Sequence, residues 1–339
     1  MEARYGYENA ARATDLVRGA LEERGMDPDM VKDGVVLGSG LGGFANKELN
    51  SGHKGESGPL VLSYGEIFEQ IGLEVPKGQS IPGHSKQLVV GPMEGLEGLV
   101  VAQAGREHLY EDVNPARAVF WLRVMQLLGV ETLLASNAAG IVTPNTLSVG
   151  DIMTVMGDRG ADRDVALKGP NDENFGPRFP HKAYNYPRDV RRLIQTTARD
   201  LGLKAVDGIY TRFPGPGYEL PSDVLEMRVL LRRIWEEGAL DPATSEDYKG
   251  LPVGTVGMSS NYEMAVAAHA SLSNKFPAFR QAQGLISVPT NYSASMGPQG
   301  FLEPSNHEEV AEAAGAIQEQ MGELGRRVIV QFEKARKTK

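Results

Sequence analysis

Short apolar runs alternate with longer stretches of helical periodicity along most of this chain. Runs of strand length stand at 35–37, 88–90, 99–101, 132–135, 152–155, 209–210, 253–256 and 285–288. Between them, apolar residues recur at helical spacing over 115–128, 187–201, 222–237 and 262–271. Strands that alternate with helices build a sheet covered by helices. The pattern therefore predicts an α/β fold with a mixed, largely parallel central β-sheet flanked by helices.

Helical patterns also mark both ends of the chain. An amphipathic helix is predicted at about 7–24, where Gly25 is a natural stop. A long helix is predicted from about 307 to 336, and Asn306 and Glu309 have the spacing of a capping box at its start. Two polar stretches, 239–250 and 274–283, read as surface insertions. We expect a single domain over 1–339.

Composition and charge narrow the class of protein. The 339 residues include 35 basic and 44 acidic side chains, a net charge of -9 that is spread along the chain, and no cysteine. This balance weighs against nucleic acid or an anionic membrane as partner. The lack of cysteine excludes disulfides, thiolate metal sites and a thiol nucleophile. Without a signal core or an apolar run of membrane-spanning length, a cytoplasmic protein is expected.

A glycine-rich turn follows the first predicted strand. It reads Gly38-Ser39-Gly40-Leu41-Gly42-Gly43, and such a turn can wrap an anion with backbone amides. Its spacing matches neither the P-loop nor the dinucleotide fingerprint. A tight turn between strand and helix explains it equally well.

A second candidate follows the run at 99–101. In an extended segment Arg106, His108 and Tyr110 fall on one side, because strand side chains repeat every two residues. A guanidinium beside an imidazole suits an oxyanion such as phosphate. The alternative is a solvated edge that carries incidental charge.

The small residues Asn137-Ala138-Ala139-Gly140 come directly after the run at 132–135. Small side chains let backbone amides approach a ligand closely. Close packing of a strand against a helix is the alternative, and the residues alone do not decide between the two.

Taken together, these segments resemble a known family. GSGLGG, GHS, QAGREHLY, SNAAG, VGDIM, GPNDENFGPRFP, GYE, VGMS, PTN and SNHEEV occur in the order and spacing of the trimeric purine nucleoside phosphorylases. The resemblance runs from about Gly34 into the final helix. It implies a cytoplasmic, homotrimeric enzyme of purine salvage that splits purine ribonucleosides with phosphate, giving free base and ribose 1-phosphate, reversibly. Phosphate is then a co-substrate, and neither an organic cofactor nor a metal is required.

The resemblance also implies roles for individual residues. The phosphate-binding group comprises Ser39, His84, Arg106, His108, Ala138 and Ser259. The nucleoside-binding group comprises Tyr110, Ala138, Gly140, Phe175, Tyr218, Glu219, Met258, Asn291 and His307, with Phe175 closing the pocket of a neighbouring subunit. The catalytic group comprises His108, Glu219, Asn291 and His307.

Several of these residues also have plainer explanations. Ser259 could cap the helix that follows it, since serine is a common cap. Met258 fits a core position, and His307 a solvated helix start. Glu219 stands in an irregular loop, where a carboxylate usually faces water.

The sequence departs from the family pattern at four positions. Lys86 stands where glycine is usual, Leu220 replaces a threonine, Tyr292 a lysine, and Asn261 belongs to a stretch that usually contains Val-Pro-Glu. Because these changes cluster beside the base pocket, they bear on substrate choice. Inosine and guanosine are the first expectation. The alternatives are a methylthioadenosine or xanthosine phosphorylase, a noncatalytic nucleoside-binding protein on the same fold, and a hydrolytic nucleosidase.

Overall fold

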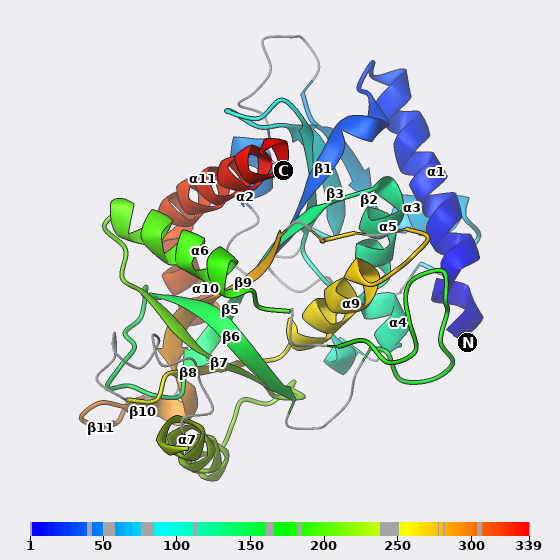
Figure 1. Cartoon of the computed structure of the whole chain (residues 1–339). Helices are drawn as coiled ribbons and strands as arrows, with labels where there is room; N and C mark the ends of the chain where they lie inside the picture. The colour runs from blue at the N-terminus through cyan, green and yellow to red at the C-terminus, as the bar shows by residue number, and fades with distance from the viewer. Residues whose placement is uncertain are drawn as a thin grey trace.

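One large sheet forms the centre of the molecule (Figure 1). The computed structural model describes residues 2–38, 43–49, 58–75, 85–111, 114–160, 166–181, 185–237, 251–276, 278–280, 282–303 and 307–338. The strands are β1 (Val31–Leu37), β2 (Leu60–Ser63), β3 (Gln87–Pro92), β4 (Leu99–Ala104), β5 (Thr132–Ile141), β6 (Ile152–Gly160), β7 (Ala205–Arg212), β8 (Gly254–Gly257), β9 (Ala282–Tyr292), β10 (Met296–Gly297) and β11 (Gly300–Phe301).

The helices lie between and around these strands. The α-helices are α1 (Tyr7–Glu23), α2 (Gly43–Glu48), α3 (Tyr64–Gln70), α4 (Pro115–Ala118), α5 (Phe120–Leu128), α6 (Arg188–Asp200), α7 (Pro221–Glu236), α9 (Asn261–Ser271), α10 (His307–Ala316) and α11 (Gln318–Lys337). Single 3-10 turns are η1 (Glu2–Tyr5), η2 (Pro28–Met30), η3 (Leu109–Glu111) and η5 (Ser293–Ser295).

The sheet curls back on itself. Its strand order is β2-β3-β4-β1-β5-β8-β7-β6-β9, and β5 also pairs with β9, so β5, β8, β7, β6 and β9 form a closed ring. Within the sheet β1 is parallel to both β4 and β5, and β5 is parallel to β9. The β5–β8 and β6–β9 pairs are antiparallel. Gly140 and Ile141 at the end of β5 pair with Val256 and Thr255 of β8 and with Asn291 and Tyr292 of β9, so the last residues of these three strands lie close together.

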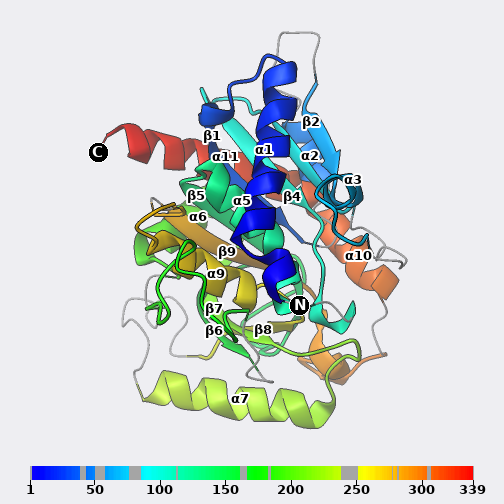
Figure 2. The ribbon, with the colours of Figure 1, turned by 90° about the vertical axis from the view of Figure 1, so that its right-hand side faces the viewer.

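Two helical layers cover the sheet (Figures 1 and 2). Apolar side chains of α1, α3, α5 and α9 pack into one core cluster, and those of α2, α6 and α11 pack into a second. α1 shows how the sequence determines this, because Ala10, Ala13, Val17 and Leu21 recur at helical spacing and are all buried. α7 lies at one end of the molecule (Figure 2), and its buried Val224, Met227, Leu231 and Trp235 belong to the first cluster.

The predicted α/β fold with its mixed sheet is confirmed, and each predicted strand overlaps a strand of the structure. The helix predicted at about 7–24 is α1. The predicted helix at 115–128 is interrupted at Val119, and the predicted final helix changes direction at Ile317, which separates α10 from α11.

The stretch 274–283 is not wholly a surface insertion as expected. Ala278 and Phe279 are buried, the Phe279 amide donates to the Val130 carbonyl, and β9 already begins at Ala282. Ala278 and Phe279 pack in the interior of the protein. The polar residues around them in the sequence gave no sign of this burial. Residues 239–250 lie outside the described residues, and a single domain over the whole chain stays a prediction. Among the described residues, no helix is long and apolar enough to cross a membrane.

Candidate active site

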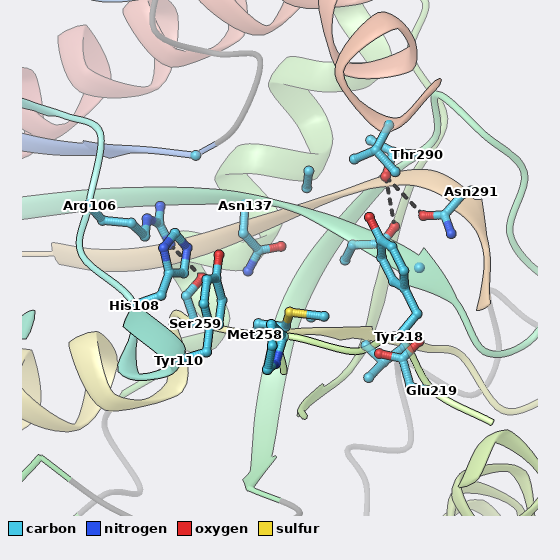
Figure 3. A pocket seen from close by; sticks show the side chains of 18 residues that line it. Arg106, His108, Tyr110, Asn137, Tyr218, Glu219, Met258, Ser259, Thr290 and Asn291 are labelled. Carbon is cyan, nitrogen blue, oxygen red and sulfur yellow. Dashed lines mark hydrogen bonds between the residues drawn. The ribbon is translucent and has the colours of Figure 1, made fainter. Parts of the chain in front are cut away.

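A pocket of about 320 Å³ opens where β5, β8 and β9 approach their carboxyl ends. The loops after β4 and β7 complete its wall. It is lined by Gly38, Arg106, His108, Tyr110, Asn137, Ala138, Ala139, Gly140, Pro216, Tyr218, Glu219, Val256, Gly257, Met258, Ser259, Thr290, Asn291 and Val310. Figure 3 shows two groups of polar side chains in this pocket, with Met258 between them. We call them the Arg106 end and the Glu219 end.

The small residues 137–140 belong to β5 itself and not to a loop after it. β5 continues to Ile141, and its register with β9 shifts between Ala139 and Gly140. A Cβ on Gly140 would lie 3.2 Å from the Ser293 Cβ, so only glycine allows this close approach without displacement. These residues permit close packing, here against Ser293, and they line the pocket, while the approach of their amides to a ligand stays a prediction.

Arg106 is fixed by its neighbours at the Arg106 end. Its Nη1 donates to the Ser259 Oγ at 2.9 Å and to the Ser260 Oγ at 2.8 Å, and it lies 3.1 Å from Glu263 Oε2. Its Nη2 donates to the Ser136 carbonyl oxygen. Arg106 is 1% exposed and Glu263 is fully buried. Burial raises the pKa of Glu263, and the charge of Arg106 opposes that rise. The result is a buried cation at the wall of the pocket, held by a carboxylate behind it.

His108 lies beside Arg106 (Figure 3). Its Nδ1 is 3.2 Å from Glu111 Oε1, which also accepts a hydrogen bond from the His108 amide at 2.8 Å. Its ring stacks on Tyr110 with a centroid distance of 4.7 Å. Burial lowers the pKa of His108, although the Glu111 hydrogen bond acts to raise it. The arrangement favours a neutral imidazole with its proton on Nδ1, because an ionised carboxylate can only accept.

Ser259 is not a helix cap. Ser260 precedes α9 as its N-cap residue, and no side chain makes a capping hydrogen bond there. The Ser259 hydroxyl instead accepts from Arg106, and the Ser259 amide donates to the Tyr210 hydroxyl at 3.2 Å. Asn137 joins the same network, since its Nδ2 donates to the Ser260 Oγ at 2.9 Å. The position of Ser259 is thus set by the groups that also hold Arg106.

The Glu219 end carries a buried carboxylate. Glu219 is 8% exposed, and its Oε2 accepts a hydrogen bond from the Ser293 Oγ at 2.7 Å. Burial raises the pKa of Glu219, and the Ser293 hydrogen bond opposes the rise. The plainer explanation of Glu219 as a solvated loop residue is therefore wrong.

Asn291 lies beside the Thr290 hydroxyl. The Thr290 hydroxyl lies 3.2 Å from Asn291 Oδ1 and 3.3 Å from the Ala139 carbonyl oxygen. With Oδ1 accepting from Thr290, Asn291 retains its Nδ2 donors for a ligand. The Glu219 end thus offers an acceptor and a donor to one bound molecule.

Ten predicted site residues line this one pocket: Arg106, His108, Tyr110, Ala138, Gly140, Tyr218, Glu219, Met258, Ser259 and Asn291. Ser39 and His84 lie outside the described residues. His307 begins α10, whose Val310 lines the pocket, but the His307 side chain also lies outside the description.

Phe175 does not line the pocket. Its ring is 3% exposed, lies 4.5 Å from the Arg123 guanidinium carbon and meets Tyr7 edge to face. A ring buried in its own chain presents almost no surface to a neighbouring subunit. In the same segment Phe179 is 88% exposed. The motif contains both phenylalanines, and the sequence alone did not show which one is buried.

Several supporting residues were missed by the sequence reasoning. Glu111, Glu263 and Ser293 each hold a site residue, and Asn137 and Thr290 line the pocket. Asn137 and Thr290 stood within quoted motifs and Glu111 directly after one, so proximity in sequence was an available signal for them. Glu263 is distant from Arg106 along the chain, and no local pattern links them. Within the described residues, no group of three or more His, Cys, Asp or Glu side chains could hold a metal ion.

Comparison with known proteins identifies the family of this chain. The model of the phosphorylase superfamily matches residues 60–329. Purine nucleoside phosphorylase 1 of Bacillus subtilis is 32% identical over 306 residues, covering 90% of this chain and 94% of that protein.

Two solved structures of purine nucleoside phosphorylase from Schistosoma mansoni resemble the whole chain. The complex with adenosine has a TM-score of 0.73 and 26% identity, covering 96% of this chain and 97% of the other. The complex with inosine has a TM-score of 0.71 and 25% identity, covering 96% of each chain. With its superfamily match over most of its length and a bacterial relative that aligns over nine tenths of it, this chain belongs to the purine nucleoside phosphorylase family.

Proposed function

We propose that this enzyme catalyses the reversible phosphorolysis of purine ribonucleosides, inosine and guanosine first, with phosphate bound at the Arg106 end and the base at the Glu219 end. The single observation that carries the proposal is the pairing of a buried guanidinium with a buried carboxylate at opposite ends of one pocket. Phosphate carries the negative charge that the Arg106 guanidinium can bind. A 6-oxopurine nucleoside carries an N1-H that can donate to the Glu219 carboxylate.

The reaction needs charge stabilisation at both ends. Breaking the N-glycosidic bond builds positive charge on the ribose and negative charge on the purine. A phosphate dianion beside Arg106, His108 and Ser259 stabilises the ribose cation and attacks C1' with inversion. Ala138 also lines the pocket, and its amide stays a prediction as a phosphate ligand. Ser39 and His84 stay predictions as further phosphate ligands.

Base recognition follows from the donors and acceptors at the Glu219 end. Asn291 Nδ2 donates to purine N7 as electrons flow into the ring, since its Oδ1 already accepts from Thr290. The Glu219 carboxylate accepts from N1-H, which inosine and guanosine carry and adenosine lacks. Tyr218 covers the base, and Tyr110 and Met258 line the ribose. Contact of His307 with the 5'-hydroxyl stays a prediction from the sequence. Adenosine is bound in one solved structure of a Schistosoma mansoni relative, so the panel that tests the proposal includes adenosine.

No organic cofactor and no metal takes part in this scheme, and phosphate is the co-substrate. The cytoplasmic location also stays a prediction.

The test is a nucleoside panel incubated with and without phosphate. Inosine and guanosine should release base only when phosphate is present, with ribose 1-phosphate as the second product. Equal base release without phosphate would replace the phosphorylase by a hydrolase. A preference for methylthioadenosine or xanthosine would move the chain to another branch of the superfamily. Binding without turnover would leave only a nucleoside-binding protein.

Assembly into a homotrimer belongs to the same proposal. Phe179 is the exposed aromatic ring of the segment in which the sequence pointed to Phe175, so Phe179 is the better candidate to reach a neighbouring pocket. Heterologous contacts of this kind close a ring. Phe179→Ala should raise the KM for nucleoside and keep the fold, whereas Phe175→Ala should destabilise the chain by about 3–5 kcal/mol. An active monomer in light scattering, with unchanged KM in Phe179→Ala, would refute the trimer.

A further inference from the structure

Lys86 occupies an unusual backbone conformation just before β3. Its φ is 51°, in the left-handed region that favours glycine. Its carbonyl oxygen accepts a hydrogen bond from the Tyr64 amide at 3.0 Å, which holds the backbone in place. A lysine kept in a conformation that suits glycine better suggests that its side chain is needed there.

The Lys86 side chain reaches the Arg106 end through one carboxylate. Its Nζ lies 2.8 Å from Glu111 Oε2, while Glu111 Oε1 accepts from the His108 amide and contacts His108 Nδ1. The exposed fraction of the side chains is 22% for Lys86, 17% for Glu111 and 8% for His108. The three residues therefore form a chain of contacts that ends at His108 in the wall of the pocket.

The charges along this chain determine which proton His108 carries. Burial acts to raise the pKa of Glu111, but hydrogen bonds from His108 and Lys86 outweigh it and bring the pKa down to about 2. Glu111 is therefore ionised near neutral pH, and it fixes the ring proton of His108 on Nδ1. The neutral ring then has a lone pair on Nε2.

Charged and titratable groups from several elements act on the His108 ring. Arg106 and Lys86 lower its pKa by their charge, Glu111 raises it, and Tyr110 stacks on it. Lys86 acts in two ways, because it adds a positive charge and because it takes up part of the negative charge of Glu111. Both effects disfavour a second proton on His108 in the free enzyme.

We propose that Lys86 is a positioning residue, which shares the Glu111 carboxylate with His108 and so keeps the ring neutral and oriented until phosphate binds. The proposal rests on the assignment of phosphate to the Arg106 end. When phosphate arrives as the monoanion, its P–OH proton moves to His108 Nε2. This leaves the phosphate dianion beside an imidazolium ion, and no proton is gained or lost overall. The dianion is then the nucleophile.

The direct test is a titration of His108 in the free enzyme by NMR of histidine-labelled protein. The His108 signal is identified by its absence in His108→Gln. Lys86→Met should raise the pKa of His108 by about one unit, and Lys86→Arg should keep the wild-type value. Glu111→Gln should lower it. In the Glu111→Gln background, Lys86→Met should raise the pKa of His108 by much less than it does in the wild-type background. An unchanged pKa in Lys86→Met, or an equal rise with and without Glu111, would overturn the proposal.

Lys86→Gly separates positioning from a merely structural role. Glycine relieves the left-handed backbone, so this variant should unfold at no lower temperature than the wild type. It should nevertheless show the same rise in the pKa of His108 as Lys86→Met, together with a KM for phosphate that differs from the value shared by the wild type and Lys86→Arg. A wild-type KM in Lys86→Gly would contradict positioning.

The two kinds of failure can be told apart. The NMR titration uses no nucleoside and no turnover, so it tests the contact chain even in an inactive preparation. A wild-type enzyme that released base without phosphate would defeat the proposed function whatever the titration showed. Phosphate-dependent turnover together with an unshifted His108 would defeat the role of Lys86 alone.

Discussion

The two ends of the pocket differ in how firmly their side chains are held. At the Arg106 end the guanidinium is 1% exposed and is bonded to two serine hydroxyls and a buried carboxylate. At the Glu219 end the carboxylate is 8% exposed, but its neighbours Tyr218 and Leu220 are 47% and 64% exposed. The comparison indicates that the Arg106 end is preorganised by the core, whereas the Glu219 end borders solvent and can change with few consequences for folding.

The two ends also treat their carboxylates in opposite ways. Glu111 has two side-chain donors, and its pKa falls to about 2 despite burial. Glu219 has the Ser293 hydroxyl, which does not offset burial, and its pKa rises. Near neutral pH the charge of Glu111 thus favours the fold, while that of Glu219 is unfavourable until a ligand donates to it.

The largest effect is expected from loss of Arg106. Arg106→Ala should reduce kcat/KM for phosphate by about 10³-fold or more, and it should also destabilise the chain by about 3–5 kcal/mol because Glu263 is left buried without its cation. Arg106→Lys serves as the control that keeps a charge. Steady-state kinetics and thermal unfolding together measure both effects. Equal losses of phosphate use and of free purine binding would show that this end does not bind phosphate.

A second large effect concerns the choice of base. A site built to accept from N1-H can reject an analogue without it by roughly 10⁴- to 10⁵-fold. Inosine should therefore exceed adenosine by orders of magnitude in kcat/KM. Glu219→Gln should lower kcat/KM for inosine by about 10²-fold, and Asn291→Asp should narrow the gap between the two nucleosides. Comparable values for adenosine and inosine in the wild type would mean that Leu220 and Tyr292 have remodelled this end.

A third effect is on stability and has opposite signs at the two ends. Because the folded pKa of Glu111 is lowered, its contribution is full above its ordinary pKa of 4.5 and is lost as pH falls toward about 2. Glu111→Gln should therefore melt lower than the wild type at pH 7, and the deficit should shrink below pH 4.5.

Glu219 is the matched case with a raised folded pKa. Its ionised form costs stability above that pKa, and the cost disappears as pH falls below its ordinary value of 4.5. Glu219→Gln should melt higher than the wild type at pH 7 and lose this advantage in acid. Melting temperatures of both variants across pH are the measurement. If both variants shifted the melting temperature in the same direction at pH 7, the electrostatic contrast between the two ends would be refuted.

The smallest effect is expected for Tyr218→Phe. The side chain is about half exposed and is assigned to cover the base with its ring. Removing the hydroxyl should change kcat/KM for inosine by less than about threefold, since an exposed hydrogen bond contributes little net free energy. A loss of tenfold or more would assign the hydroxyl to substrate recognition.

The sequence predicted the regular elements with strong local patterns and missed those without them. The core strands are continuous apolar runs, and α1 has a clear helical stripe. β2 has four residues and α2 has six, too few for a period to stand out. Closure of the ring depends on pairing between β5 and β9, which are far apart in sequence. No local propensity encodes such a contact.

The site residues also divide into those with a local sequence pattern and those without one. Arg106 and His108 were predictable because they alternate at a strand end in residue types that suit an anion. Their partners were not, since Glu263 is 157 positions from Arg106 and joins it only through the fold. The choice between Phe175 and Phe179 depends on burial against α1 and α5. For Glu219, only family resemblance pointed to a loop carboxylate that the fold then buries.

The assignment of the two ends is tested most directly by phosphate affinity, measured by calorimetry for the wild type, Arg106→Lys and Glu219→Gln. Arg106→Lys should weaken phosphate binding by about tenfold or more, because the planar fork is lost, while Glu219→Gln should stay within about twofold of the wild type. Similar losses in both variants, or a larger loss in Glu219→Gln, would contradict the separation of an anion-binding end from a base-binding end.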